Sequence, residues 1–339
     1  MDLKPDFTFR PLPPVAQPVH LPFADLPNPL GPLSYLPGTW TGKGFNTIWR
    51  PFRGDDKNQD RFLELNLTEE TIEFSAIGGG IPNRGLLQPD LIMFGVHYLQ
   101  QIADANLPGN PGLHIEPGIW LTVPETTNPA EPPTVVRMAS IPHGTTMLAQ
   151  GSSTGFQGPP TFPVIDIVPI SNKTGSPQDF PERDLSKSTP YRSPPEQTKG
   201  ITQAMVDNVA TVLAEAISKQ TILATRELRV STRATSPMVG GGTSNTAFLA
   251  GTRSDGPNAD AVRVDATFWI ELVQGSDGLP DFHQLQYAQT VFLVFDDITW
   301  PHATVATLRQ VKEVAVPVQR IDPDIPIEVL QRIQEAAKP

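Results

Sequence analysis

Short runs of β-branched and aromatic residues, broken by turn residues, recur about every ten residues along this chain. Hairpin-linked strands of this spacing have to close or stack in order to hide their edges. The spacing therefore predicts an all-β fold, an antiparallel up-and-down β-barrel of about ten strands. The runs cover residues 39–49, 62–67, 71–76, 93–102, 113–123, 135–141, 146–150, 221–232, 246–251, 261–273, 284–296 and 302–311.

Three segments break the strand pattern. Residues 1–28 form a proline-rich N-terminal arm without periodicity, and residues 312–339 form a C-terminal tail with a predicted helix at 326–337. Residues 151–220 interrupt the barrel with Gly-Pro and Ser-Pro pairs and a predicted helix at 201–219, which has one apolar stripe. We therefore expect a single barrel domain over 29–311, and the inserted helix is placed to cap an open end of that barrel.

Composition excludes several classes of function. The chain has 25 basic and 36 acidic residues and a formal net charge of −11, which disfavours nucleic acid and anionic membranes as partners. It has no cysteine, which excludes disulfides, thiolate nucleophiles, zinc–thiolate sites and covalent c-type haem. The start of the sequence lacks a signal-peptide pattern and no apolar run approaches membrane-spanning length, so we expect a cytoplasmic protein. The sequence leaves room for a homodimer.

His302 opens the last predicted strand. Strand alternation places it on one face with Thr304, Ala306 and Leu308. A neutral imidazole among small and apolar neighbours suits an iron ligand, because small residues leave room for a flat macrocycle. The ordinary alternative is a hydrogen-bonded histidine at the mouth of a strand.

Three further histidines have weaker signals. His114 and Glu116 share a strand face, so the carboxylate would orient the imidazole, although such pairs are also ordinary polar neighbours. His143 lies at a turn, where it would either overhang a pocket mouth or be solvated. His97 lies within a strand and its direction is open. Trp40 follows a turn glycine, and such a Gly-x-Trp typically closes one end of a ligand-binding barrel.

Four blocks of the sequence resemble one family. They are Leu33-Ser-Tyr-Leu-Pro-Gly-Thr-Trp-Thr-Gly-Lys-Gly, Leu113-His-Ile-Glu-Pro-Gly-Ile-Trp, Val135-Val-Arg-Met-Ala-Ser on to Gly144, and the last hairpin from Gln289 to Val311. Their order and approximate spacing are similar to those of nitrobindin-like haem proteins, whose ten-stranded barrel is related to fatty-acid-binding and lipocalin-type barrels. An ungapped match over the last hairpin sets the family's histidine against Ala303, so placing it at His302 needs a one-residue bulge.

The resemblance implies a five-coordinate ferric haem b, held without a covalent bond by His302 as the metal ligand. Trp40, Thr304 and Trp120 are the other residues that we expect at the cofactor site. An open sixth position would admit small molecules such as nitric oxide, peroxynitrite or peroxide. The implied activity is therefore isomerisation of peroxynitrite to nitrate, or a peroxidase-like reaction.

A peroxidase also needs an acid–base group on the open side of the iron. His143 and the His114–Glu116 pair are the candidates for this catalytic role. Two other functions remain open from the residues alone. One is a haem-free barrel that carries or senses an apolar small molecule such as a fatty acid, with Arg137 or Arg263 binding its carboxylate. The other is an interaction protein that uses the proline-rich arm.

Overall fold

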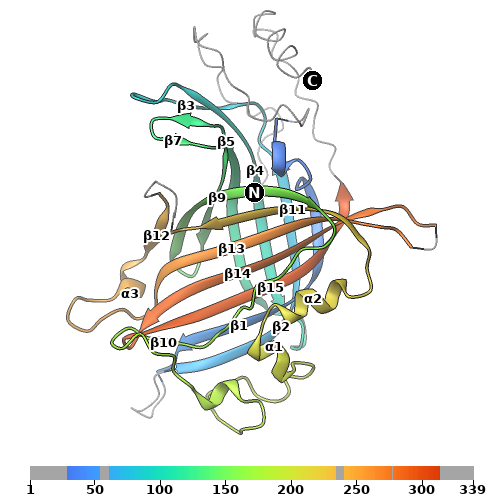
Figure 1. Cartoon of the computed structure of the whole chain (residues 1–339). Helices are drawn as coiled ribbons and strands as arrows, with labels where there is room; N and C mark the ends of the chain where they lie inside the picture. The colour runs from blue at the N-terminus through green and yellow to red at the C-terminus, as the bar shows by residue number, and fades with distance from the viewer. Residues whose placement is uncertain (1–28, 54–60, 234–239, 277, 314–339) are drawn as a thin grey trace, which may run out of the picture.

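The computed structural model describes residues 29–53, 61–233, 240–276 and 278–313, and these form a closed antiparallel barrel (Figure 1). The predicted up-and-down β-barrel is confirmed. Ten strands follow one another around the wall, and the last pairs with the first. In order they are β1 (Gly38–Pro51), β2 (Arg61–Ala76), β4 (Leu91–Asp104), β5 (Gly112–Val123), β8 (Thr134–Ile141), β9 (Thr145–Gln157), β11 (Ile222–Ser231), β13 (Asp260–Val273), β14 (Phe282–Phe295) and β15 (Ile298–Glu313).

Short additional strands pair with strands of the barrel wall. β3 (Ile81–Asn83) pairs with β4, β10 (Ile170–Ser171) with β15 and β12 (Gly242–Asn245) with β9. The separate hairpin of β6 (Thr126–Thr127) and β7 (Ala130–Glu131) follows β5. The predicted strand at 246–251 is instead a short helix, α3 (Ala247–Ala250), which ends at Gly251 with φ of 73°. Its Ala-Phe-Leu-Ala core does not alternate, so sequence pattern alone does not distinguish strand from helix there.

One end of the barrel is closed by apolar residues and is called here the plug end. The 3-10 helix η1 (Gly31–Leu33) lies there, and Leu30, Leu33, Leu36 and Trp40 pack into the interior core. The Trp40 indole N–H donates to the Leu36 carbonyl oxygen over 2.7 Å, which satisfies the polar atom of a fully buried ring. The opposite end, called the far end, carries the turns at 105–111, 142–144 and 296–297.

The inserted segment covers the outside of the barrel and does not cap an end. β9 continues to Gln157, so the excursion spans residues 158–221 and includes η2 (Pro181–Arg183), α1 (Gln203–Asp207) and α2 (Thr211–Ile217). Its side chains pack on the outer face of β1, β2 and β13–β15 (Figure 1). The core they form contains Phe45, Trp49, Leu63, Leu65, Ile167, Ile201, Met205, Val206, Val209, Leu213, Trp269, Ala288, Phe295, Trp300, Ala303 and Val305.

The predicted helix at 201–219 is broken into two by Asn208. The Asn208 side-chain oxygen accepts hydrogen bonds from the backbone N–H groups of Ile165 and Ala210, at 3.0 and 3.2 Å. Asparagine competes with helical hydrogen bonding in this way, so the apolar stripe continues while the helix does not. The N-terminal arm at 1–28 and the predicted helix at 326–337 lie outside the described residues, and β15 extends two residues past the expected boundary at 311.

Candidate ligand-binding site

His302 faces the barrel interior. On β15 the side chains of Ala306 and Leu308 belong to the interior core, whereas Ala303 and Val305 belong to the core outside the wall. Alternation therefore places His302 and Thr304 inside. The register between β14 and β15 is continuous from one end of the hairpin to the other, so the expected one-residue bulge is absent. The ungapped family match therefore falls on Ala303, which faces outward, whereas His302 is the residue that faces inward.

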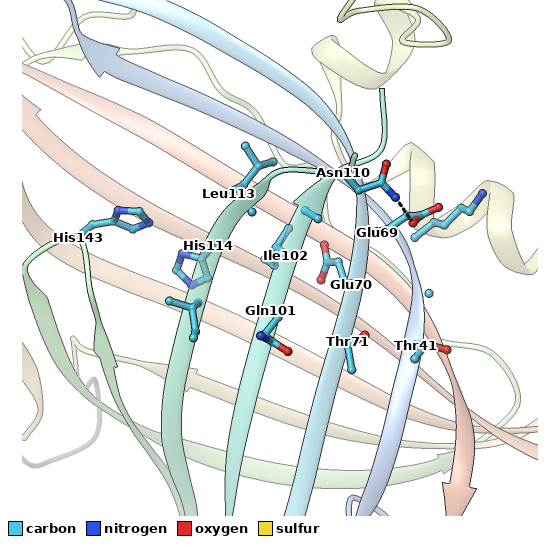
Figure 2. Close-up of a pocket in the computed structure, with 15 residues that line it drawn as sticks. Thr41, Glu69, Glu70, Thr71, Gln101, Ile102, Asn110, Leu113, His114 and His143 are labelled. Carbon is cyan, nitrogen blue, oxygen red and sulfur yellow. Dashed lines mark hydrogen bonds between the residues drawn. The ribbon is translucent and has the colours of Figure 1, made fainter. Parts of the chain in front are cut away.

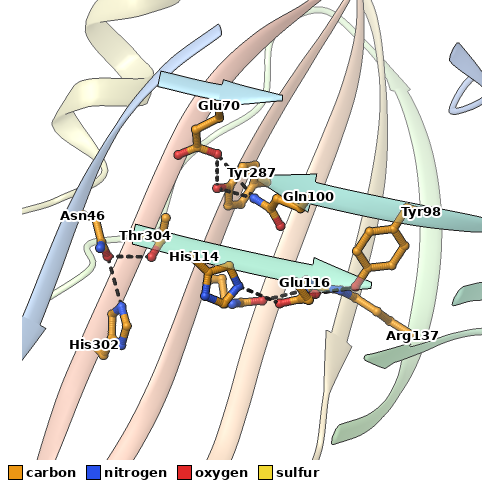
Figure 3. Close-up of polar contacts among 11 residues, drawn as sticks. Asn46, Glu70, Tyr98, Gln100, His114, Glu116, Arg137, Tyr287, His302 and Thr304 are labelled. Atoms are coloured by element: carbon orange, nitrogen blue, oxygen red, sulfur yellow. Dashed lines mark hydrogen bonds and ion pairs between the residues drawn. The ribbon is translucent and has the colours of Figure 1, made fainter. Parts of the chain in front are cut away.

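His302 is held by a neighbouring strand. Its Nε2 lies 3.0 Å from the Asn46 side-chain oxygen, which also accepts from the Thr304 hydroxyl over 2.8 Å (Figure 3). Because an amide oxygen only accepts, Nε2 carries the hydrogen and Nδ1 keeps the lone pair. Burial, followed by the charges of His114 and His143, lowers the pKa of His302 to about 3, so this imidazole is neutral at pH 7.

A buried ion-pair cluster lies on β4, β5 and β8. Arg137 pairs with the Glu116 carboxylate, the Tyr98 hydroxyl donates to the same carboxylate oxygen, and Arg137 Nε donates to that hydroxyl over 2.8 Å. His114 Nε2 lies 3.3 Å from the other Glu116 oxygen (Figure 3). Burial alone would raise the pKa of Glu116, but Arg137 and the hydrogen bonds from His114 and Tyr98 lower it to about 2. Glu116 is therefore a fixed negative charge that orients His114.

The His-x-Glu-x-Gly spacing of residues 114–118 has a steric reason. A Cβ added at Gly118 would lie 2.4–2.5 Å from the ring carbons and hydroxyl of Tyr98 on the adjacent strand. The missing side chain at Gly118 therefore leaves the space in which the Tyr98 ring sits. The Tyr98 hydroxyl can then reach Glu116 and Arg137, so the glycine supports the ion-pair cluster indirectly.

Arg137 is fully engaged within the protein. Its guanidinium carbon lies 5.0 Å from the ring centre of Phe268 and 5.8 Å from that of Trp120, and Nη1 donates to the Gln289 side chain over 2.6 Å. Arg263 pairs instead with Asp265. Both arginines therefore already have carboxylate partners, which a lipid carboxylate would have to displace.

Glu70 is a site residue that the sequence reasoning missed. Tyr287 donates to its Oε2, Gln100 Nε2 lies 3.3 Å from the same oxygen, and the Thr68 hydroxyl donates to Oε1 over 2.8 Å (Figure 3). Burial raises the pKa of Glu70 to about 7 against these hydrogen bonds. The signal was available: Glu70 has the same alternation phase as Ile72 and Phe74, which are core residues of the same strand.

A hollow of about 820 Å³ lies beside these groups (Figure 2). Glu70, Ile102 and His114 contribute from the inner face of the wall, whereas Thr71 and Gln101 contribute from the outer face, so the hollow is open to solvent. The remaining lining residues are Thr41, Gly42, Lys43, Glu69, Ala103, Asn110, Gly112, Leu113, Ile115 and His143.

The structure brings His143 and His114 together. Their ring centres are 5.5 Å apart, and burial followed by the charge of His114 lowers the pKa of His143. Both rings also contribute to lowering the pKa of His302, as expected of groups that face the same interior space. Trp40 and Trp120 are placed differently, because both are packed in the interior core and neither lines the hollow.

The described residues lack two features, a cluster of metal-binding side chains and a membrane-spanning helix. No group of three or more His, Cys, Asp or Glu side chains in this part of the chain is arranged to hold a metal ion. Within the same ranges, no helix has the length and apolar character needed to cross a membrane. Comparisons of the chain with protein-family models, with curated proteins and with solved structures found no match.

Proposed function

We propose that this chain is a ligand-binding barrel that holds a haem b at its far end, with His302 as the protein ligand of the iron. The observation that carries the proposal is a neutral imidazole that faces inward from a wall strand, with the small side chains Thr304 and Ala306 on the same face. A metal ligand has to be deprotonated at the coordinating nitrogen, and burial keeps His302 in that form at neutral pH.

The residues at the far end fit the nitrogen ligand that a haem requires. Nδ1 of His302 keeps a lone pair, whereas ligation through Nε2 would require the Asn46 amide to release it. His302 and Thr304 are not among the residues that line the hollow, and the polar lining of the hollow by Glu70 and His114 differs from the apolar pocket that the family resemblance implies. When bound, a histidine-ligated haem with an open sixth position supplies a binding site for nitric oxide, peroxynitrite or peroxide.

The chain's own residues would supply proton-transfer groups at the far end of the barrel. Glu116 stays charged, and its Oε2 lies 3.3 Å from His114 Nε2, so the imidazole is held in one orientation beside a negative charge. His143 is exposed, and its lowered pKa leaves it a neutral base near pH 7. Of the two, His143 has the more direct path to solvent, which suits a group that exchanges protons.

A haem-free barrel that carries a small molecule is the second candidate function. The observation that favours it is the polarity of the hollow, whose lining includes Glu70, Gln101 and Asn110. Because Arg137 is occupied by Glu116, such a ligand would not be held through a carboxylate at that arginine.

The test of the haem proposal is a titration of the purified protein with haemin, followed by absorption spectroscopy. A sharp Soret band that saturates at one haemin per chain, and that shifts on reduction and on addition of nitric oxide, would support the proposal. A spectrum identical to that of free haemin at every ratio would overturn it. In that case, extraction and mass spectrometry of the purified protein would identify the molecule that the barrel carries.

A further inference from the structure

We propose that Glu70 is the recognition group for a positively charged nitrogen. In this proposal the hollow binds a small organic amine, with the ammonium group at Glu70 and the alkyl part near Ile102 and Leu113. The site is built by residues of the chain alone and goes beyond the proposed haem function. It is expected in the haem-free protein as well.

Two of the buried carboxylates on the wall strands, Glu116 and Glu70, differ in their partners. Glu116 and Glu70 are 0% and 3% exposed. Glu116 has a cation in direct contact, the Arg137 guanidinium, and a histidine on its other oxygen. The hydrogen-bond donors to Glu70 are all neutral: the Tyr287 phenol, the Gln100 amide and the Thr68 hydroxyl. Among the described residues, the donors in contact with Glu70 thus include no cation, and the charge of His114 acts on it only from a distance.

Glu70 lies at the border of the hollow. A buried carboxylate is costly without a counter-charge, so one that borders an open hollow marks a place for a charged ligand. Glu70 lines that hollow and is fixed there on both oxygens by three donors. An ammonium group in the hollow would compensate the negative charge of Glu70, as Arg137 compensates that of Glu116.

The Glu70 carboxylate is closely packed on the side of β1. A Cβ added at Gly44 would lie 2.8 Å from Glu70 Oε1 and 2.8 Å from the Ala306 Cβ. The missing side chain at Gly44 therefore leaves the space that the carboxylate itself occupies, so a ligand would reach Glu70 from the hollow. Ile102 and Leu113 line the same hollow, so the short alkyl part of an amine has apolar surface to contact. The chemical class that fits is a primary alkylammonium with a short chain.

The probe for this proposal is n-butylammonium, with 1-butanol as its neutral isostere, titrated into haem-free protein by calorimetry at about pH 8, where Glu70 is mostly ionised. We expect saturable binding of n-butylammonium and at least about tenfold weaker binding of 1-butanol, since hydrogen bonds to charged groups are the stronger ones. Glu70→Gln should remove this preference. Glu73→Gln is the matched control, because it removes a carboxylate from the same strand on its exposed outer side and should leave binding unchanged.

A second readout uses wild-type protein and does not depend on the folding of a variant. At about pH 7 part of the Glu70 population carries a proton that an ammonium ion would displace, so binding should release protons. Repeating the titration in two buffers of different ionisation enthalpy measures this release. Equal binding of both probes, equal binding by Glu70→Gln, no binding of n-butylammonium, or binding without proton release would each overturn the proposal. None of these results bears on haemin binding, which is measured separately.

Discussion

At the scale of single residues, one glycine leaves room for the tyrosine of the ion-pair cluster. Gly118 leaves the space for the Tyr98 ring, and the Tyr98 hydroxyl links Glu116 to Arg137. The sequence motif around His114 therefore describes a packing requirement as well as a polar pair. Its glycine and its carboxylate act on the same tyrosine from two sides.

Substituting Gly118 by Ala should be strongly destabilising for this reason. The new Cβ would meet rigid ring atoms of Tyr98 at 2.4–2.5 Å, and overpacking of a closed core costs about 1–3 kcal/mol. The loss is measured as the change in free energy of unfolding in urea. Gly112→Ala on the same strand is the control, because a Cβ there has no atom within 4 Å. Equal stability of the two variants would refute the packing argument.

The buried carboxylate of Glu271 leads to a prediction about pH. Glu271, on the outer face of β13, is 0% exposed, accepts one hydrogen bond from Gln284 over 2.7 Å and has no partner at Oε1. Burial raises its pKa to about 7 from the ordinary 4.5. The folded state thus holds this proton more tightly than the unfolded chain does. The destabilising effect of Glu271 is absent below pH 4.5 and grows as the pH rises through 7.

Glu271→Gln should therefore stabilise the protein at about pH 8 by about 1–3 kcal/mol and have little effect at about pH 5. Urea unfolding of both proteins at the two pH values measures the difference. A stability gain that is the same at both pH values, or a loss at about pH 8, would show that ionisation of Glu271 is not its cause.

At the scale of elements, alternation in the strands predicted the barrel correctly, while the place of the insertion did not follow from the sequence. The apolar stripe through Met205, Val209 and Leu213 is real, and these residues are buried. However, a stripe does not specify its partner surface, and here that surface is the outer face of the wall. That surface includes the outward-facing apolar residues Trp49, Trp300 and Val305, against which the stripe packs.

The insertion should therefore unfold together with the barrel. Leu213→Ala removes a side chain that is 0% exposed between α2 and the wall, and such truncations cost about 2–5 kcal/mol. We expect a single cooperative transition in urea at a lower midpoint. Leu279→Ala is the control, because that leucine is 65% exposed and its truncation should cost less than about 0.5 kcal/mol. A separate early transition in the Leu213 variant would show that the insertion is an independent unit.

At the scale of the whole molecule, the barrel divides into a packed plug end and a polar far end. Trp40, Phe74 and Trp120 fill the interior core, and His114, His143 and His302 lie toward the turns of the opposite end. The sequence indicated His114, His143 and His302 separately. It did not predict their arrangement at one end of the barrel, because this arrangement depends on the closure of β15 onto β1. It missed Glu70, since an isolated glutamate in a strand resembles a solvated one until its phase is compared with the core.

The most direct test of the account compares haemin binding by wild-type protein, His302→Ala and His283→Ala in one absorption titration. His283 lies at the plug end of β14, with its ring centre 5.0 Å from that of Tyr35, and serves as the matched histidine control. The account predicts a Soret band for wild-type protein and for His283→Ala, and at least about tenfold weaker haemin binding for His302→Ala. An unchanged Soret band and affinity in His302→Ala would contradict it.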